Sequence, residues 1–412
     1  MEKLYIKNFG GIKEAEIPLS NINVFIGPQA SGKSIIVKLI FYFKKFWNDI
    51  INEQRITSQQ LINNRLEEFR RYFPEHTWPA KKFEIVFSQN SLSLTITKKN
   101  KNIKLELSDE VKNIINIINN FHEVFNSEKL LNNFFDKRKE IRKLTDFINN
   151  EIGQKFFYST QIFIPAGRSC FSNIIKKNIF SFTEQQLSLD PFLIHFGKML
   201  EIFNSLFLEK RFDEKIAPFI KEILKGEYFE EEDEQYILHN DGRKVQIAYA
   251  SSGQQEIYPL LMILTYLFDS LLFDKSVSLY VEEPEAHLYP RAQKNIVKLL
   301  VKLFNRYKKD KIQINITTHS PYILSSFNNF LYGGYLEKKY IKNKKKREEL
   351  YSIYPKDELL TPGLMSAYSL NGKVQNIMNE ENHLIDQNAL DEISNEIADE
   401  FDKLLDLEYG KK

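Results

Sequence analysis

Residues 22–43, INVFIGPQASGKSIIVKLIFYF, decide the fold. The apolar, partly β-branched start of this stretch predicts a buried strand, and the apolar spacing after it predicts a helix. The loop between them fits the pattern G-x-x-x-x-G-K-[ST], in which inward N–H groups and the helix N-terminus hold phosphate. An ordinary turn with a chance lysine is disfavoured by this strand–helix context. The expected phosphate-binding residues are Gly27, Pro28, Gln29, Ala30, Ser31, Gly32, Lys33 and Ser34, with Lys33 on the β/γ-phosphates and Ser34 also on Mg²⁺.

Composition sets broad limits on the protein class. The chain has 412 residues, is 42% hydrophobic and carries a net charge of +2, which suits two or three domains and argues neither for nor against nucleic acid. A single cysteine, Cys170, excludes an intramolecular disulfide and fits a reducing cytosol. The N-terminus lacks a signal-peptide pattern. The longest apolar run contains Asp269, which favours a buried helix over a membrane span, so we expect a cytoplasmic protein with no membrane association.

Strand and helix patterns alternate around the phosphate loop, and this predicts an α/β core. Residues 83–108 alternate with period two and predict a β-meander, while hairpins are expected around Asp241-Gly242 and Asn371-Gly372. Three parts are expected. They are the N-terminal half of the core with the phosphate loop and the β-meander (1–108), a mostly helical inserted lobe with one core strand near 159–166 (109–235), and the C-terminal half of the core with a closing amphipathic helix (236–412).

Two glutamates follow a predicted buried strand at residues 277–281. Ligands of parallel α/β sheets bind at the carboxyl ends of the strands. Glu282 is therefore expected to hold Mg²⁺ and Glu283 to act as the general base toward water. The alternative is a solvated acidic turn, and the apolar run directly before the pair weighs against it.

Two further segments carry candidate residues. His319 follows another predicted strand, where it could sense the γ-phosphate; taken alone, a histidine at the start of the next helix is the better interpretation. Ser251, Ser252, Gly253 and Gln254 begin a long apolar helix and form a second anion-ready N-terminus. Because one nucleotide does not need two cradles from one chain, a symmetric dimer is expected, in which each copy closes on the other's nucleotide.

The motifs GPQASGKS, IPAGRS, SSGQQE, EEPEAHLYP and TTHSPYIL resemble, in this order, the heads of ABC-type ATPases. In detail they are similar to the SMC/RecF/OLD branch, above all to the AAA15/AAA21 ATPases of bacterial anti-phage defence systems such as PARIS and Septu. The resemblance implies an ABC-ATPase head, with a mixed sheet around the phosphate loop, an N-terminal antiparallel β-subdomain and an inserted helical lobe.

The resemblance also implies residue roles. Glu282 stands at the Walker B metal position, Glu283 and His319 at the catalytic positions, and Ser252 with Gly253 acts on the partner's nucleotide. The sequence departs from the family pattern at two positions. The metal position is often Asp, and the longer side chain of Glu282 suggests slow hydrolysis. Tyr289 replaces the second histidine of the usual HLHP sequence. Gln161 is the candidate for the metal-contacting glutamine of the Q-loop. ATP and Mg²⁺ are the implied cofactors.

By the same resemblance, the chain would form a homodimer or higher homo-oligomer and act as scaffold and sensor of a defence complex. It would control a separate effector, a Toprim-like or HNH nuclease, in response to a phage-encoded trigger. The alternative is a RecF/SMC-like repair ATPase that binds DNA directly through basic segments at 136–143 and 337–349. An ABC transporter subunit is disfavoured by the SSGQQ sequence.

Overall fold

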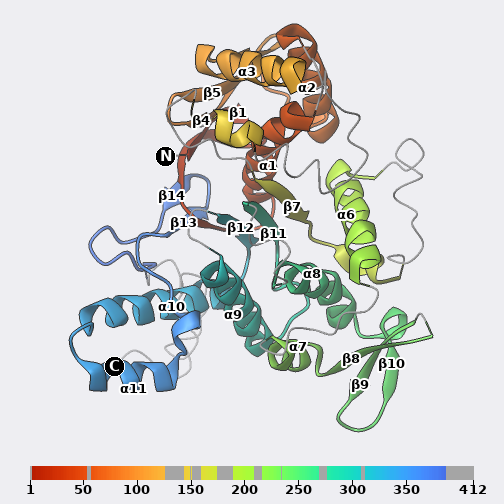
Figure 1. The fold of residues 1–412 in the computed structure, drawn as a ribbon, viewed down its shortest axis with the longest axis vertical. Helices are drawn as coiled ribbons and strands as arrows, with labels where there is room; N and C mark the ends of the chain where they lie inside the picture. Colours follow the sequence, from red (N-terminus) through yellow and green to blue (C-terminus); the bar gives the residue numbers. More distant parts are fainter. Residues whose placement is uncertain are drawn as a thin grey trace, which may run out of the picture.

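The computed structural model describes residues 2–52, 57–125, 143–148, 150, 159–173, 189–207, 216–232, 234–268, 276–307 and 311–386. A six-stranded sheet in the order β14-β13-β3-β12-β11-β7 lies at its centre (Figure 1). Neighbouring strands within this sheet are parallel, except for β14, which is antiparallel to β13. The strands are β3 (Ile22–Ile26), β7 (Thr160–Ile164), β11 (Val277–Glu282), β12 (Ile312–Thr318), β13 (Met365–Leu370) and β14 (Val374–Asn376).

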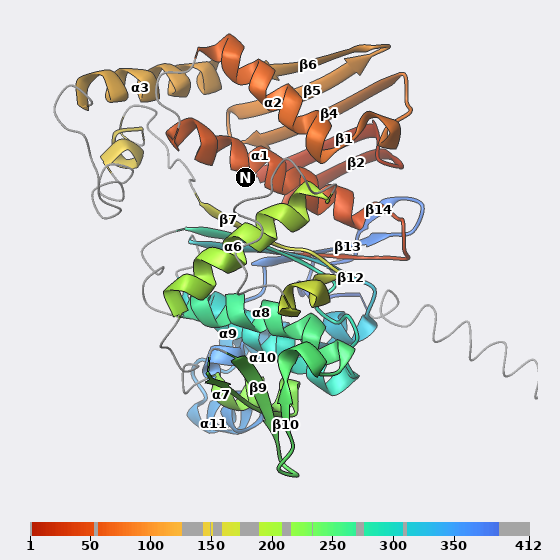
Figure 2. The ribbon, with the colours of Figure 1, turned by 90° about the vertical axis from the view of Figure 1, so that its right-hand side faces the viewer.

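A second sheet of five antiparallel strands, in the order β2-β1-β4-β5-β6, is built from the N-terminal part of the chain. Its last three strands form the meander predicted over residues 83–108, which is thereby confirmed. A small antiparallel sheet, β10-β9-β8, projects from the other end of the molecule (Figure 2). These strands are β1 (Glu2–Phe9), β2 (Ile12–Leu19), β4 (Lys82–Gln89), β5 (Leu92–Lys99), β6 (Asn102–Leu107), β8 (Gly226–Glu231), β9 (Glu234–His239) and β10 (Lys244–Gln246).

Helices cover both faces of the central sheet. Figure 2 shows α1 between the two large sheets and α8, α9 and α10 on the far side of the central one. The helices are α1 (Lys33–Asn52), α2 (Ser58–Tyr72), α3 (Asp109–Phe125), α6 (Pro191–Phe207), α7 (Ala217–Leu224), α8 (Ser252–Phe268), α9 (Pro290–Arg306), α10 (Pro321–Lys339) and α11 (Lys344–Ile353), with short 3₁₀ turns η1 (Glu75–Thr77), η2 (Arg168–Asn173), η4 (Ile247–Tyr249) and η6 (Lys356–Glu358). The predicted α/β class, with a mixed sheet and an antiparallel sheet, is confirmed.

The central strands are buried on both faces, and alternate side chains enter different hydrophobic cores. Val24 and Leu279 belong to the core shared with α8 and α9, whereas Phe25 and Tyr280 belong to the core shared with α1 and the antiparallel sheet. This is the period-two geometry of a strand, in which successive side chains point to opposite faces. The phosphate loop therefore leaves a strand that both cores fix in place.

The elements expected to form a helical lobe over residues 109–235 do not form one lobe in the part that the structure describes. Helix α3 packs on β5 and α1, α6 packs on β7 and α8, and α7 packs on α9. Within the expected lobe, residues 226–231 form strand β8, and residues 234–235 begin strand β9. The reason is physical: each of these helices has an apolar face, which is buried in the existing cores, with α3 in one core, α7 in the other and α6 contributing to both. The closing helix expected near residues 390–405 and most of the basic segment 136–143 lie outside the described residues.

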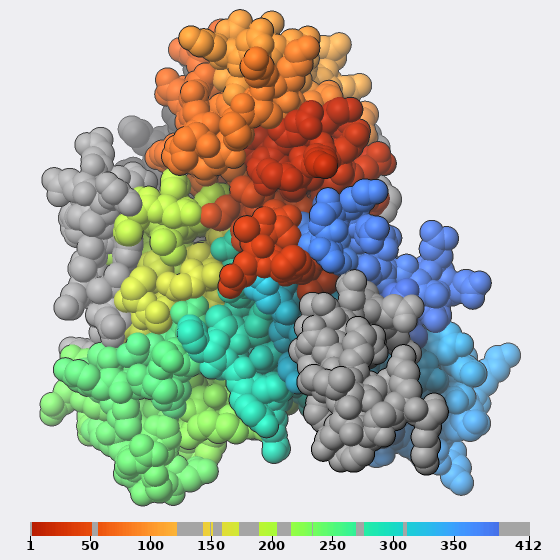
Figure 3. Space-filling view, turned by 180° about the vertical axis from the view of Figure 1, so that it is seen from behind, coloured from red at the N-terminus to blue at the C-terminus, as the bar shows by residue number. Residues whose placement is uncertain are grey.

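Segments from the two ends of the described chain lie together. Viewed from behind, the N-terminal residues and the segment that carries β13 and β14 are neighbours on one face (Figure 3). This follows from the pairing of β13 with β3 and the packing of β14 on β2. None of the helices within the described ranges combines the length and apolar character needed to span a bilayer.

Candidate nucleotide-binding site

Three neighbouring strands of the central sheet end at the same edge and bring the predicted motifs together. In the parallel register Ile26 of β3 pairs with Thr318 of β12, and Thr317 pairs with Glu282 of β11. The phosphate loop, the two glutamates and the histidine each follow one of these strand ends. Motifs almost 300 residues apart in sequence therefore face one another, at the edge where parallel α/β sheets bind ligands.

The phosphate loop curls around the side chain of Lys33. Its Nζ atom donates hydrogen bonds to the carbonyl oxygens of Gly27 and Pro28, both at 2.8 Å. Gly32 has φ +98°, a conformation that favours glycine, and its carbonyl accepts the 3.1 Å bond from Ile36 that starts α1. Burial lowers the pKa of Lys33, although the carboxylates of Glu283 and Glu285 oppose that shift. An anion beside the ammonium would also oppose that shift.

The two glutamates at the tip of β11 differ in exposure. Glu282 is buried, and its Oε2 atom accepts a 3.3 Å hydrogen bond from the backbone of Ala166, whereas its Oε1 atom has no hydrogen-bond partner among the described residues. Glu283 is half-exposed and has φ 44°, a strained backbone conformation for a glutamate. Such strain is often found at functional sites, because the surrounding structure must hold it in place.

His319 connects Glu283 with Lys33. Its Nε2 atom lies 3.1 Å from Oε1 of Glu283, and its Nδ1 atom lies 3.4 Å from Nζ of Lys33. The side chain of Ser320 caps α10 by accepting a 3.2 Å bond from the backbone of Tyr322, so the histidine is not the capping residue. The capping interpretation of His319 is therefore wrong, and its ring lies between the phosphate loop and Glu283.

Sequence reasoning missed Glu285. Its Oε1 atom accepts hydrogen bonds from Oγ1 of Thr318 at 2.7 Å and from the backbone N–H of His319 at 2.6 Å. It therefore fixes the segment that carries the histidine. The signal was a third acid in the sequence EEPE, two residues beyond the predicted base.

Residues 251–254 form the start of α8, where Ser251 and Ser252 are exposed. The Oγ atom of Ser251 donates to the side chain of Gln254 at 2.9 Å and accepts a weak bond from its backbone at 3.4 Å, as in a helix cap. At Gly253 a Cβ atom would lie 2.7 Å from the carbonyl oxygen of His287. The glycine therefore allows the start of α8 to pack against the segment that follows Glu283.

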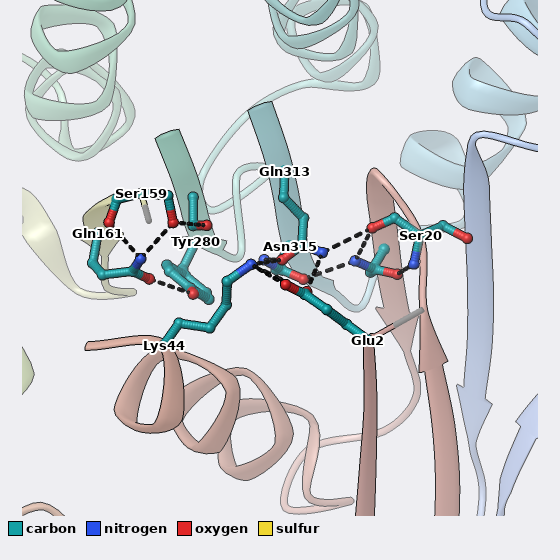
Figure 4. Close-up of polar contacts among 10 residues, drawn as sticks. Glu2, Ser20, Lys44, Ser159, Gln161, Tyr280, Gln313 and Asn315 are labelled. Atoms are coloured by element: carbon teal, nitrogen blue, oxygen red, sulfur yellow. Dashed lines mark hydrogen bonds and ion pairs between the residues drawn. The ribbon is translucent and has the colours of Figure 1, made fainter. Parts of the chain in front are cut away.

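Gln161 is not brought to this site. It pairs with Ser278, four residues before Glu282, and so lies about 13 Å short of the strand tip. Its amide nitrogen donates to the carbonyl and hydroxyl oxygens of Ser159, and its oxygen accepts a 2.6 Å bond from Tyr280 (Figure 4). The expectation that Gln161 contacts the metal was wrong, because its polar atoms are used inside the fold.

Figure 4 also shows the polar contacts that fix α1 to the two large sheets. The Nζ atom of Lys44 lies 3.1 Å from the carboxylate of Glu2 and donates to Oε1 of Gln313 at 2.9 Å. Gln313 in turn donates to Glu2 at 2.9 Å and to the carbonyl of Ser20 at 3.1 Å. Burial lowers the pKa of Lys44, and the Glu2 carboxylate opposes that shift. The helix that begins at the phosphate loop is thus held in place three turns after its first residue.

Comparison with known families assigns this arrangement to one of them. Residues 1–324 match the family model described as AAA ATPase domain, which spans most of the chain. The chain belongs to the AAA ATPase domain family. This confirms the AAA15 membership that the motifs predicted. For this AAA ATPase, the family implies that a nucleotide is bound and that Mg²⁺ is used with it.

Several solved structures are similar to this AAA ATPase at low sequence identity. They include an SMC head domain from Thermotoga maritima (14% identity, 92% of this chain and 98% of that one, TM-score 0.37), the recombination mediator protein RecF (10%, 91% and 97%, 0.31) and a nucleotide-free ATP-binding cassette from an ABC transporter (13%, 93% and 93%, 0.31). Among curated proteins, the kinesin-like protein KIP1 of Saccharomyces cerevisiae is 44% identical over 59 residues, which are 14% of this chain and 5% of that protein's length.

Proposed function

We propose that this AAA ATPase binds ATP with Mg²⁺ between two copies of the chain and hydrolyses it. We further propose that its nucleotide state holds or releases a separate effector protein in anti-phage defence. The observation that carries the ATPase part is the chain of contacts from Glu283 through His319 to Lys33 at the phosphate loop. It joins a carboxylate, an imidazole suited to sensing the γ-phosphate and a phosphate-binding cation in one site.

The proposed reaction is attack of water on the γ-phosphorus. The carboxylate of Glu283 accepts a proton from that water as the new P–O bond forms, and the bond from the γ-phosphorus to the β–γ bridging oxygen breaks. The products are ADP, inorganic phosphate and a proton. Lys33 leaves the carbonyls of Gly27 and Pro28 to contact the phosphates, and His319 contacts the γ-phosphate through the nitrogen that faces Lys33. Both nitrogen-bearing side chains lower the energy of the charge that develops on phosphate oxygens.

The residues present fit a magnesium ion. Three buried side-chain oxygens near the loop have no hydrogen-bond partner in the described part of the chain. They are Oε1 of Glu282, the hydroxyl of Thr317 beside it and the hydroxyl of Ser31 in the loop. Buried oxygens of this kind need a partner. Oxygen ligands are also those that Mg²⁺ prefers, with water and phosphate completing its shell. Glu282 and Ser34 would hold the ion, which when bound polarises the phosphate oxygens.

Pairing of two copies is supported by the start of α8. Ser251, Ser252 and Gly253 form a helix N-terminus whose two serines are exposed, and such a terminus attracts anions. Gly253 packs against the backbone of His287, and the side-chain amide of Gln254 donates a 2.7 Å hydrogen bond to the carbonyl oxygen of Leu224. In a two-fold dimer this cradle would close on the nucleotide of the partner, and each site would then be complete only in the pair.

The defence role rests on the resemblance of the motifs to anti-phage ATPases, and two experiments test the proposal. The first measures phosphate release from MgATP by wild-type protein and Glu283→Gln. The second co-expresses the chain with its neighbouring gene and purifies by a tag on this chain. A nucleotide-dependent complex with the neighbouring protein supports the effector role, whereas no partner with either variant would overturn it.

A second candidate function, direct DNA binding in repair, is favoured by one observation. The hairpin of α10 and α11 lies at the edge of the molecule (Figure 1). It carries the stacked and exposed rings of Tyr332 and Tyr335, with ring centroids 6.0 Å apart. Exposed cations and aromatic rings together suit nucleic acid. The lysines on or beside this hairpin are Lys338, Lys339, Lys342, Lys344, Lys345 and Lys346.

A further inference from the structure

Arg168 is fully buried at the junction of three elements of the site. It belongs to η2, directly after β7, and its guanidinium donates to four carbonyl oxygens. The bonds run to Pro165 at 2.9 Å, Glu282 at 2.8 Å, Glu283 at 3.1 Å and Glu256 at 3.0 Å. One side chain therefore holds the backbone on which both Walker B glutamates stand.

The same residue is bound to the first turns of α8. The carboxylate of Glu256 accepts hydrogen bonds from the backbone N–H groups of Arg168 at 3.1 Å and Ser169 at 2.9 Å. The hydroxyl of Ser172 donates to the carbonyl of Gln255 at 2.5 Å. The turn η2 is thus attached to α8, the helix that begins with the proposed cradle, one turn after Gly253.

Burial of the Arg168 guanidinium would cost free energy of folding if the residue served only to stabilise the fold. Burial lowers the pKa of Arg168, opposed by the carboxylates of Glu256, Glu285, Glu282 and Glu283. A buried cation must be compensated by partners, and an apolar residue of similar size often serves stability equally well. An apolar side chain, however, could not hold the carbonyls of Glu282 and Glu283 together with that of Glu256. The guanidinium therefore fixes the position of the start of α8 relative to the end of β11.

We propose that Arg168 is a positioning residue that couples the start of α8 to the tip of β11. When the partner's nucleotide draws the cradle at Ser252 and Gly253 inward, the movement passes through Glu256 and Arg168 to the backbone of Glu283. The carboxylate of Glu283 then reaches its working position only in the closed pair. This inference rests on the proposed ATPase function and adds how the two halves of the site communicate.

Arg168→Lys tests the coupling, because lysine keeps the charge but cannot contact four carbonyls in fixed directions. We expect MgATP affinity and KM to stay within about twofold, because the phosphate loop is untouched, and kcat to fall by roughly tenfold or more. The matched control is Arg65→Lys, which alters another buried arginine, paired with Asp49 and Glu68 beside α1. Arg65→Lys should lower the melting temperature about as much as Arg168→Lys does, but it should leave kcat unchanged.

A second variant removes the charge without leaving a buried ion unpaired. Arg168→Met combined with Glu256→Gln should fold and bind MgATP, yet hydrolyse it as slowly as Arg168→Lys. Hydrogen exchange of wild-type protein gives a measurement that needs no variant. Addition of MgATP should slow exchange in residues 168–172 together with residues 252–256 and 282–287.

The outcomes separate the two proposals. Wild-type protein that neither binds nor hydrolyses MgATP would overturn the proposed function. Active wild type with an equally active Arg168→Lys would overturn only the role of Arg168. So would a fall in kcat of the same size in Arg65→Lys, or slower exchange in residues 252–256 and 282–287 without a change in residues 168–172.

Discussion

The imidazole of His319 bridges Lys33 and Glu283, with its Nδ1 atom 3.4 Å from the ammonium nitrogen and its Nε2 atom 3.1 Å from the carboxylate oxygen. An ammonium group can only donate and a carboxylate can only accept. In these contacts the ring accepts at Nδ1 and donates from Nε2. A γ-phosphate oxygen can only accept, so contact with it requires a hydrogen on Nδ1, and arrival of the phosphate would change the hydrogen-bonding role of the ring beside Glu283.

Glu283→Gln should slow hydrolysis by about 100-fold or more, because the amide cannot accept a proton from water. Nucleotide affinity should stay near that of the wild type, and the nucleotide-bound dimer should accumulate. Phosphate release and sedimentation velocity with ATP measure the two effects. Glu348→Gln, on the exposed surface of α11, is the control. Undiminished hydrolysis by Glu283→Gln would remove this residue from the role of base.

Lys33→Ala should weaken MgATP binding by roughly 10- to 100-fold, since it removes charged hydrogen bonds to phosphate. Titration calorimetry checks this. Lys38→Ala is the matched control, because Lys38 lies on the same helix and pairs with Asp190 at the surface. Equal affinities for the wild type and Lys33→Ala would count against the entire site.

Gly253→Ala should disturb pairing and hydrolysis together. The added Cβ would meet the carbonyl of His287 at 2.7 Å, so either α8 or the segment after Glu283 must shift. Ser252→Arg, at an exposed position, should instead block pairing while the melting temperature of the monomer stays unchanged. If both variants still form the ATP-dependent dimer, the cradle does not act between copies.

Acid should destabilise the protein through His195. Burial lowers the pKa of this histidine to about 4, from an ordinary value near 6.5. Between these values the unfolded chain binds a proton that the folded chain does not, so the free energy of unfolding falls as the pH falls, by up to about 3 kcal/mol. His195→Phe should flatten this part of the pH profile of urea unfolding, and His76→Phe, at an exposed site, should not. Identical profiles for all three proteins would show that His195 does not titrate in this way.

The α10–α11 hairpin gives a test of the DNA-binding alternative. If Lys344, Lys345 and Lys346 contact phosphates, changing all three to Gln should reduce the slope of log affinity against log salt by about 3. The same change at Lys99, Lys101 and Lys104, which are exposed on the antiparallel sheet, serves as control. Equal slopes for both triple variants would dismiss the hairpin as a specific phosphate-binding surface.

The arrangement of the motifs was accessible from sequence, because parallel strands deliver whatever comes after them to one edge. The apolar run before Glu282 and the alternation before Thr317 indicated two strands, and the phosphate loop indicated a third. Once these strands are neighbours, the segments after them must converge. Glu283 and His319 could therefore be expected at the same edge as Lys33, whereas the structure gives the strand order that makes them direct neighbours.

Gln161 and Arg168 could not be placed in this way. A buried strand has the same apolar character at both ends, so its pattern does not tell whether Gln161 lies at the ligand edge or at the opposite one. Arg168 stood in a turn sequence, IPAGRS, where an exposed arginine is the usual expectation. Its partners are mainly backbone carbonyls more than 80 residues away, and a carbonyl leaves no trace in the sequence.

The strand order of the central sheet has a consequence for synthesis on the ribosome. Strand β3, from which the phosphate loop departs, lies between β12 and β13, whose residues are translated roughly 300 positions later. The antiparallel sheet needs only the first 107 residues and can form while the chain is still growing. Both edges of β3 stay unpaired until Thr318 has emerged, and the edge that pairs with β13 stays unpaired until Ser369 has emerged. We expect a nascent chain stalled before Thr318 to carry the whole phosphate loop and still be unable to retain ATP.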